Sequence, residues 1–401
     1  MTKTFSGLAT GIAWDLGLLH MDDPIIGFFP EECPGTPDEN LSRITVQHLL
    51  TMSCGIHENT YSDLFVQDNW VKAFLKQSFP HEPGTFYRYS THCSHMLSAI
   101  ITKVSGLSLE QFLNRYLFYP MEIYEAQWEL SPEKLTAGGM GLSLYPMSLV
   151  KIAQLLLKEG SYNGSQLISK EYLKMAVTQQ IIKQDDINNP DSEFSGNGYG
   201  YQFHIGKDGY YRMDGAFGQL CLMCPDKKKA VIVFSQYSKT EALLSLIYKH
   251  LLNDTECCCA YIENTRPEKN AAAVDAVIPC SNFRLEDNIL GIKYVEFLPS
   301  CNEYLVKLCY AEYTDTIRFS LLQETSGKMN FLKDLQVHKQ EYYCEAVFNE
   351  ALILKIYFIE TPYVAVYRFS FYGNKLRFKF SINVSFTLKD FAVDGFLVEE
   401  R

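Results

Sequence analysis

Several residues in this 401-residue chain have types and spacings that metal or redox chemistry uses. His92, Cys93 and His95 are three potential metal ligands within four positions, but the sequence offers no fourth ligand or acidic partner nearby, so we predict no metal site. Cys221 and Cys224 have the C-x-x-C spacing of redox and zinc sites. They fall in an expected strand, where residues three apart point to opposite faces, so neither function is predicted.

A glycine-rich segment at 138–141 has some likeness to a phosphate-binding loop. It lacks the Lys-Ser/Thr pair that such a loop places on the phosphates and the magnesium ion. Nucleotide binding is therefore not expected, and no other motif implies a cofactor.

A series of short segments resembles the motifs of the β-lactamase-related serine hydrolases. That group includes class C β-lactamases, D-Ala-D-Ala carboxypeptidases, esterases and linear-amide hydrolases. Each motif is weak alone, and the resemblance depends on their common order over roughly residues 1–250. The segments are 1–5 running into 11–13 and 15–19, then 44–52, 83–85 before Tyr89 and Ser90, 138–142, and 198–201.

The first motif of this family is Ser-x-x-Lys. Residues three apart lie on neighbouring turns of one helix face, so the lysine amine can take the proton of the serine. A lysine does this at neutral pH when burial or the helix N-terminus lowers its pKa. Lys3 matches the lysine, Met1 and Thr2 fill the variable positions, and the serine position falls directly before Met1.

Three interpretations of the Lys3 match are open. The chain is a fragment, or starts at a misassigned internal methionine, and lacks the serine together with the family's preceding strands; we favour this one. Alternatively it is a truncated pseudoenzyme, or the match is accidental and Lys3 is a solvated terminal lysine. Ser6 and Thr2 are poor substitutes for the serine, because Ser6 lies deeper in the helix and Thr2 faces elsewhere.

The second family motif, Tyr-x-Asn, is matched by Tyr89, Ser90 and Thr91. The resemblance implies that Tyr89 relays a proton between nucleophile and leaving group. Thr91 keeps a hydroxyl but lacks the amide donor that holds a substrate carbonyl. This weakens β-lactam or peptide recognition more than hydrolysis in general. The alternative is that Tyr89 is one of 26 tyrosines, in a partly buried loop.

The third family motif is a Lys/His-x-Gly sequence on a strand edge, and Met213, Asp214 and Gly215 occupy its place. Gly215 allows close backbone approach to a substrate, and an N–H near Ala216 would complete an oxyanion hole. Gln219 lies close by on the same predicted edge. The missing cation favours an ester or neutral amide over a substrate bearing a carboxylate. The alternative is an ordinary glycine-rich hairpin.

Helices and strands must position these residues. Apolar residues recur at helical spacing over 5–16, and Gly7 and Gly11 on the other side predict a helix buried on two sides. Together with the predicted strands, these helices predict an α+β fold with α/β layers. The resemblance implies that residues 1–255 form a β-lactamase/transpeptidase-like domain that is incomplete at its N-terminus. Further helices are predicted at 46–52, 94–104, 109–117, 147–158, 170–177 and 241–252, and strands at 198–205, 219–224 and 230–234.

Residues 256–282 show neither helical nor strand periodicity and are interpreted as a linker. From 283 to 401 the chain is nearly all strand. Apolar residues alternate with polar ones over 376–386, which predicts an antiparallel sheet or half-barrel packed on one side. The aromatic alternation there is most simply sheet core, and a ligand-binding barrel is the alternative.

Composition excludes several classes of protein. Lys plus Arg number 36 against 47 Asp plus Glu, a net charge of −11, which argues against a nucleic-acid partner. No apolar stretch reaches the ~20 residues of a membrane helix. Twelve cysteines lack the spacing of a disulfide framework, and the triplet 257–259 favours reduced thiols in a cytoplasm.

The sequence therefore predicts a serine hydrolase whose nucleophile is absent from these residues. The resemblance implies an acyl-enzyme mechanism on a small ester, amide or peptide-like substrate, without metal. The second hypothesis is a non-catalytic module that binds a cell-wall or peptide ligand. The C-terminal domain would cover the cleft or serve as an assembly surface.

Overall fold

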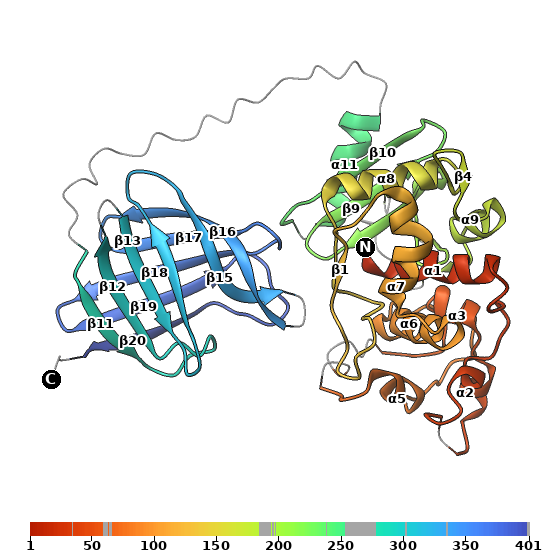
Figure 1. The fold of residues 1–401 in the computed structure, drawn as a ribbon, viewed down its shortest axis with the longest axis horizontal. Coiled ribbons are helices and arrows are strands. Elements are labelled where there is room, and N and C mark those ends of the chain that lie inside the picture. The colour runs from red at the N-terminus through yellow and green to blue at the C-terminus, as the bar shows by residue number, and fades with distance from the viewer. Residues whose placement is uncertain are drawn as a thin grey trace. The chain divides into compact units, whose positions relative to one another are not determined.

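The computed structural model describes residues 1–401 apart from 34, 59–62, 64–65, 184–193, 195, 197, 238, 253–277, 301–302, 334–335 and 399–401. The chain forms two compact units, Met1–Cys257 and Cys258–Arg401, each considered by itself (Figure 1). Most of the predicted linker, residues 256–277, lies outside the described residues.

The first unit combines helices with an antiparallel sheet. Its helices are α1 (Thr2–Asp15), α2 (Glu39–Arg43), α3 (Val46–Leu50), α5 (Trp70–Leu75), α6 (Thr91–Ser105), α7 (Leu109–Leu113), α8 (Pro146–Leu157), α9 (Lys170–Ala176) and α11 (Thr240–Ile247). The sheet has the order β10-β9-β8-β7-β6-β5. Its strands are β5 (Ile181–Ile182), β6 (Gly198–Tyr199), β7 (His204–Ile205), β8 (Tyr211–Gly215), β9 (Gln219–Cys224) and β10 (Lys229–Val233). Two small hairpins pair β1 (Gln127–Trp128) with β2 (Leu142–Ser143) and β3 (Ser161–Tyr162) with β4 (Ser165–Gln166).

Helices cover both faces of this sheet. On one face, Cys221 and Met223 of β9 join the large core that contains α1, α6 and α8. On the other face, Leu222 and Cys224 pack with Leu244 of α11 in a separate apolar cluster. Cys221 and Cys224 thus point to opposite faces, as their spacing predicts.

Helix α1 runs through the middle of the first unit and is buried on more than one side, as predicted (Figure 1). Residues 4–13 are all buried, and the helix contacts α6, α7 and α9. The hydroxyl of Tyr172 donates a hydrogen bond to Gly7 O (2.5 Å). A Cβ at Gly11 would lie 2.3 Å from the Tyr172 ring, so only glycine allows α9 to approach this closely.

Replacing Gly11 with alanine is expected to lower the free energy of unfolding by about 1–3 kcal/mol, because the new methyl group overpacks the contact with Tyr172. Gly27→Ala is the matched control, since no atom lies within 4 Å of a Cβ there. Urea denaturation followed by circular dichroism measures both variants. Equal midpoints for the two variants would contradict this view of the packing.

One predicted strand is in fact two. Residues 198–205 alternate in hydrophobicity, but the structure divides them into β6 and β7, which pair with each other. Gln202 adopts a left-handed φ of 63° between them. Its side chain donates to the carbonyl oxygens of Leu49 (3.1 Å) and Leu50 (2.9 Å). These tertiary contacts reverse the chain at a residue that the alternation alone assigns to a strand.

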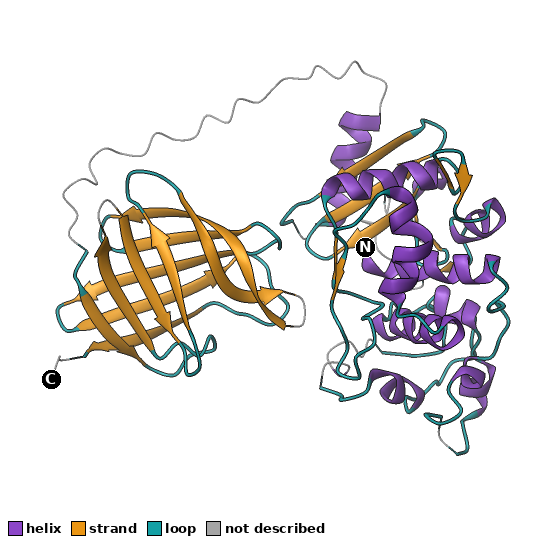
Figure 2. Cartoon of the chain, in the orientation of Figure 1, coloured by secondary structure: helices purple, strands orange, loops and turns teal. Residues whose placement is uncertain are grey.

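The second unit is an antiparallel sheet of ten strands that curls into a barrel-like form (Figures 1 and 2). Neighbours in the sheet follow the chain order, except that the first strand pairs with the last. The strands are β11 (Ser281–Leu285), β12 (Tyr294–Ser300), β13 (Glu303–Cys309), β14 (Thr314–Phe319), β15 (Thr325–Lys333), β16 (Gln336–Phe348), β17 (Leu352–Phe358), β18 (Val364–Tyr372), β19 (Lys375–Ile382) and β20 (Phe391–Leu397).

The predicted alternation over 376–386 is correct in its first half. Phe378 and Phe380 are fully buried in β19, and Arg377 and Lys379 are exposed. The strand ends at Ile382 rather than at 386, and Phe386 is exposed.

Side-chain hydrogen bonds account for this earlier end of β19. Asn383 Oδ1 accepts from the N–H of Val364 (2.8 Å), and Asp390 Oδ1 accepts from the N–H of Ile382 (3.0 Å). Side chains thus replace the backbone ladder at this point, which alternation of polarity does not reveal.

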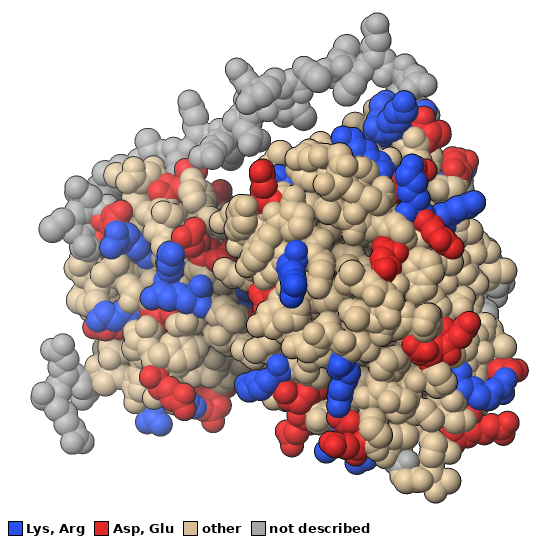
Figure 3. Space-filling model, turned by 45° about the vertical axis from the view of Figure 1, so that its right-hand side comes forward, with Lys and Arg blue, Asp and Glu red and all other residues tan. Residues whose placement is uncertain are grey.

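Two predictions from composition concern the net negative charge and the lack of a membrane-spanning helix. Over the face in Figure 3, acidic and basic side chains are interspersed. Within the described part of the chain, no helix is long and apolar enough to cross a bilayer.

Candidate active site

Lys3 and Tyr89, 86 positions apart in the sequence, lie together in the structure. Lys3 stands in the first turn of α1, and its Nζ donates to Gly139 O at 2.8 Å. The same Nζ lies 5.0 Å from the centre of the Tyr89 ring. The amino group therefore lies over the aromatic ring, within the distance of a cation–π contact when it is protonated. The two residues that the sequence predicts as base and proton relay are thus neighbours.

The Tyr89 ring is fixed by aromatic neighbours from the sheet. His204 of β7 stacks on it, with ring centres 5.8 Å apart, and Tyr199 of β6 meets it edge-on at 6.4 Å. Burial, and then the negative charge of Asp214, raise the pKa of Tyr89 well above its ordinary value of 10. The phenol hence stays protonated across the physiological range.

Thr91 occupies the first position of α6 and is buried. A Cβ at Gly139 would lie 2.5 Å from Thr91 Cγ2, so the threonine packs directly behind the glycine whose carbonyl binds Lys3. The structure therefore places Thr91 as support for Gly139. The importance of Gly138 and Gly139 was not predicted beyond their part in a family segment, although the Gly-Gly pair is a visible signal of close packing.

Gly215, Ala216 and Gln219 lie at the end of the β8–β9 hairpin. Gly215 pairs in register with Gln219, and a Cβ at Gly215 would lie 2.5 Å from Gln219 Oε1. The backbone nitrogen of Met1 donates to Asp214 O at 2.5 Å. This contact brings the hairpin end to the beginning of α1, so the third predicted group lies beside the turn that carries Lys3.

A charged network behind this hairpin was not predicted from the sequence. Arg212 Nε donates to both carboxylate oxygens of Asp214, at 3.0 and 3.1 Å, and His204 Nε2 lies 3.8 Å from Asp214 Oδ2. Burial alone would raise the pKa of Asp214, but the positive charge of Arg212, the largest opposing effect, lowers it below its ordinary value. Asp214 is thus an ionised carboxylate whose negative charge is balanced by Arg212 of the same strand.

The other hydroxyl groups of the α1 N-terminal half are engaged in the packing. Ser6 is fully buried, and its Oγ donates to Gly138 O at 2.6 Å. Thr2 Oγ1 accepts from the N–H of Leu142 at 3.3 Å.

His92, Cys93 and His95 go to three different partners. His92 Nε2 lies 3.4 Å from Gln77 Nε2, Cys93 Sγ lies 3.2 Å from Cys54 Sγ, and His95 Nε2 lies 3.1 Å from Glu133 Oε1. Each side chain has a different partner, so closeness in sequence does not bring the three to one centre. No group of three potential ligands occurs elsewhere in the described ranges.

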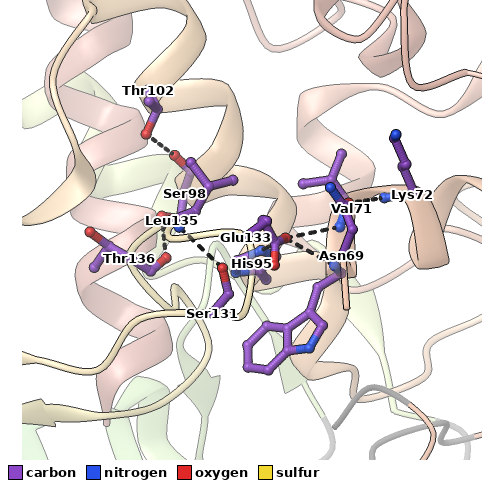
Figure 4. Close-up of polar contacts among 11 residues, drawn as sticks. Asn69, Val71, Lys72, His95, Ser98, Thr102, Ser131, Glu133, Leu135 and Thr136 are labelled. Carbon is purple, nitrogen blue, oxygen red and sulfur yellow. Dashed lines mark hydrogen bonds and ion pairs between the residues drawn. The ribbon is translucent and has the colours of Figure 1, made fainter. Parts of the chain in front are cut away.

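Glu133 is the centre of the polar cluster in Figure 4. Its Oε1 accepts from His95 and from the backbone N–H groups of Trp70 (2.9 Å) and Val71 (3.3 Å), which begin α5. Burial alone would raise the pKa of Glu133, but the hydrogen bond and charge of His95, with further donors, lower it to about 2. The carboxylate therefore ties α5 to α6 in its ionised form.

We predict that Glu133→Gln lowers the free energy of unfolding at pH 7 by about 1–2 kcal/mol, since a hydrogen bond to a charged group is lost. The folded pKa of about 2 lies below the unfolded value near 4.5, so this stabilisation exists above pH 4.5 and disappears as the pH falls toward 2. Urea denaturation at pH 7 and pH 3 should show a smaller difference at pH 3. A difference that is the same at both pH values, or equal to that of the exposed control Glu171→Gln, would refute the assignment.

The layered α+β fold, the lysine of α1 and the tyrosine before α6 define the class of β-lactamase-related serine hydrolases. The chain belongs to the Beta-lactamase family, whose family model matches residues 1–252. This range covers nearly all of the first unit and all the site residues described above.

Curated relatives match parts of this chain at low identity. A beta-lactamase of Yersinia enterocolitica is 24% identical over 124 residues, which is 31% of each chain. A beta-lactamase of Escherichia coli is 28% identical over 131 residues, 31% of this chain and 32% of the relative. An uncharacterised protein of Alkalihalophilus pseudofirmus is 25% identical over 48% of this chain and 57% of its own length. The matched parts thus span between about a third and three fifths of these relatives.

Solved structures share the fold over most of the chain. The octameric penicillin-binding protein homologue from Pyrococcus abyssi has a TM-score of 0.50 at 19% identity, over 94% of this chain and 84% of its own. The structure of SurE with D-Leu has a TM-score of 0.50 at 16% identity, over 92% and 81%. At such identities these likenesses concern the fold.

Proposed function

We propose that this chain carries the active site of a serine hydrolase that forms an acyl-enzyme with an ester or amide. The observation that carries the proposal is the meeting of three separate elements: Lys3 from α1, Tyr89 before α6, and the Asp214–Gly215 edge of β8. A lysine beside a protonated tyrosine and an open backbone edge supplies a base, a proton donor and an oxyanion site.

The nucleophile in this proposal is a serine directly before Met1. Its Oγ attacks the substrate carbonyl carbon while Lys3 takes its proton, and the oxyanion binds the backbone N–H groups near Gly215–Ala216 and of the serine itself. The leaving alcohol or amine departs with a proton delivered through Tyr89. Water then attacks the acyl-serine, which releases the carboxylic acid and restores the serine.

The charges around the site support an ester or neutral amide as substrate. Met213, in place of the family's cation, is buried, and Asp214 is compensated by Arg212 rather than by a ligand. Thr91 is buried behind Gly139, so it offers little to a substrate amide. We propose that Gln219, half-buried beside Gly215, contacts the substrate at the edge of the site.

We also propose that residues 1–255 and 283–401 are separate domains joined by a linker at 256–282. The hydrolase acts in a reducing, cytoplasmic compartment in this proposal.

A second candidate function is a non-catalytic module that binds a peptide-like ligand. It is favoured by Thr91 and Met213, which depart from two of the three family motifs. The two functions differ in one respect that is easily measured: a module binds its ligand without turnover, and a hydrolase with a serine before Met1 consumes it.

The proposal is tested by inserting a serine directly before Met1 and measuring hydrolysis of p-nitrophenyl esters and anilides, with an alanine insertion as the matched control. The serine form is expected to hydrolyse esters and to be labelled by a fluorophosphonate at that serine. The alanine form is expected to do neither. Equal, negligible activity of both folded forms would contradict the proposal that a serine at this position completes the site.

A further inference from the structure

The imidazole of His204 forms one wall of the Tyr89 site. Its ring stacks on Tyr89 with centres 5.8 Å apart and planes 30° apart. Tyr199 meets both rings edge-on, at 5.1 Å from His204 and 6.4 Å from Tyr89. Lys3 Nζ also lies over the Tyr89 ring, at 5.0 Å. Each of these contacts restricts rotation of the Tyr89 ring.

The sheet fixes the position of His204 itself. His204 pairs in register with Tyr199 of β6 on one side and with Arg212 of β8 on the other. Asp214, two residues after Arg212 on the same face of β8, places Oδ2 3.8 Å from His204 Nε2. Arg212 Nε holds both oxygens of that carboxylate. The backbone of His204 is therefore held between two strands, and its ring lies near a carboxylate that Arg212 keeps in place.

His204 carries no proton charge near neutral pH. Burial lowers its pKa to about 3, and the positive charges of Arg212 and Lys183 act in the same direction, against the opposing effect of Asp214. Its Nδ1 is buried and has no hydrogen-bond partner among the described residues. A neutral ring with one nitrogen toward Asp214 is suited to pack against Tyr89 and poorly suited to carry protons.

We propose that His204 is a positioning residue: its ring, placed by the pairing of His204 with Tyr199 and Arg212, holds the Tyr89 phenol at the orientation in which its hydroxyl serves Lys3 and the leaving group. This role rests on the proposed function, since it matters for catalysis only if Tyr89 relays a proton. His204 acts through Tyr89 and touches no reacting atom. The shape of its ring is the property that matters.

The first test uses the chain as it stands, without any activity. Tyrosine is labelled with ¹³C in its ring, and Tyr89→Phe identifies the Tyr89 resonance. His204→Ala is expected to shift this resonance and to speed up flipping of the Tyr89 ring, because the stacked partner is lost. His204→Phe keeps the stack and is expected to restore slow flipping, and the exposed control His250→Ala changes nothing. An unchanged Tyr89 in folded His204→Ala protein overturns the proposal.

The second test uses the form with a serine before Met1. His204→Ala is expected to lower kcat about 10- to 100-fold with KM nearly unchanged, since small displacements of a catalytic group cost factors of this size. His204→Phe should recover most of kcat, and the pH profile should keep its shape. If His204→Phe is as slow as His204→Ala, or loses an ionisation from the profile, the positioning role is refuted.

The two tests separate the two claims. If the serine form of the unmutated chain is inactive, the proposed function fails. The NMR comparison still decides whether His204 holds Tyr89. If the serine form is active and the NMR spectra of Tyr89 do not respond to His204→Ala, the hydrolase stands and the positioning role falls.

Discussion

Lys3→Met should abolish ester hydrolysis by the form of the chain that carries a serine before Met1, with a loss of roughly 10³- to 10⁴-fold in kcat, the upper range for removing a general base. Methionine keeps most of the length and apolar stem of lysine. The contact with Gly139 O at 2.8 Å and the cation–π contact with Tyr89 are both lost, but the packing around α1 is retained.

Lys3→Arg distinguishes a base from a simple positive charge. Arginine keeps the charge and can still donate to Gly139 O, but its pKa is too high for it to take a proton. If Lys3 is the base, Lys3→Arg is as inactive as Lys3→Met. Substantial activity of the arginine variant would mean that Lys3 acts by charge alone. Initial rates with p-nitrophenyl acetate and labelling by a fluorophosphonate measure both variants, with the exposed Lys72→Met as control.

Tyr89→Phe is expected to lower kcat by about 10²- to 10³-fold for alkyl esters and anilides, since these leaving groups need a proton as they depart. Activated p-nitrophenyl esters should lose far less, because p-nitrophenolate leaves without protonation. The phenylalanine ring retains the contacts with His204 and Tyr199, so stability should change little. The ratio of the two losses, rather than either loss alone, identifies a proton relay.

The pH dependence gives a second view of Tyr89. Burial and Asp214 raise its pKa, so its neutral form persists to higher pH than that of an ordinary tyrosine. We therefore expect that ionisation of Tyr89 causes no fall in kcat/KM between pH 7 and 9. A fall caused by Tyr89 would be present in the unmutated enzyme and absent from Tyr89→Phe. Such a fall would mean that Tyr89 ionises in the working range. A uniform loss for all leaving groups in Tyr89→Phe, or an equal loss in the exposed control Tyr119→Phe, would contradict the relay.

The family resemblance made part of the site predictable. Lys3 and Tyr89 match motifs whose order in the chain is itself a signal, and the structure brings the Lys3 Nζ within 5.0 Å of the centre of the Tyr89 ring. Gly7 and Gly11 predicted a helix packed on two sides, because small residues opposite an apolar stripe let a second element approach closely. The prediction for Lys3 and Tyr89 depended on short sequence motifs, and the prediction for Gly7 and Gly11 depended on the pattern within one helix.

The network of His204, Arg212 and Asp214 could not be predicted in the same way. These residues belong to adjacent strands, and their contacts depend on strand register, which is set by tertiary packing rather than by local pattern. The division of residues 198–205 at Gln202 depends likewise on hydrogen bonds to Leu49 and Leu50, which lie 153 and 152 positions away. The periodicity of hydrophobic residues does not reveal hydrogen-bond partners that are distant in the sequence.

The central claim is that Lys3 serves a serine placed directly before Met1. The measurement that tests it most directly is mapping of the N-terminus of the protein from its native source, by intact mass and terminal peptides, after treatment with a fluorophosphonate. The account predicts a longer chain in which the serine that precedes Met1 carries the probe. A native chain that begins at Met1 and carries no labelled serine would contradict the account and leave the binding module in its place.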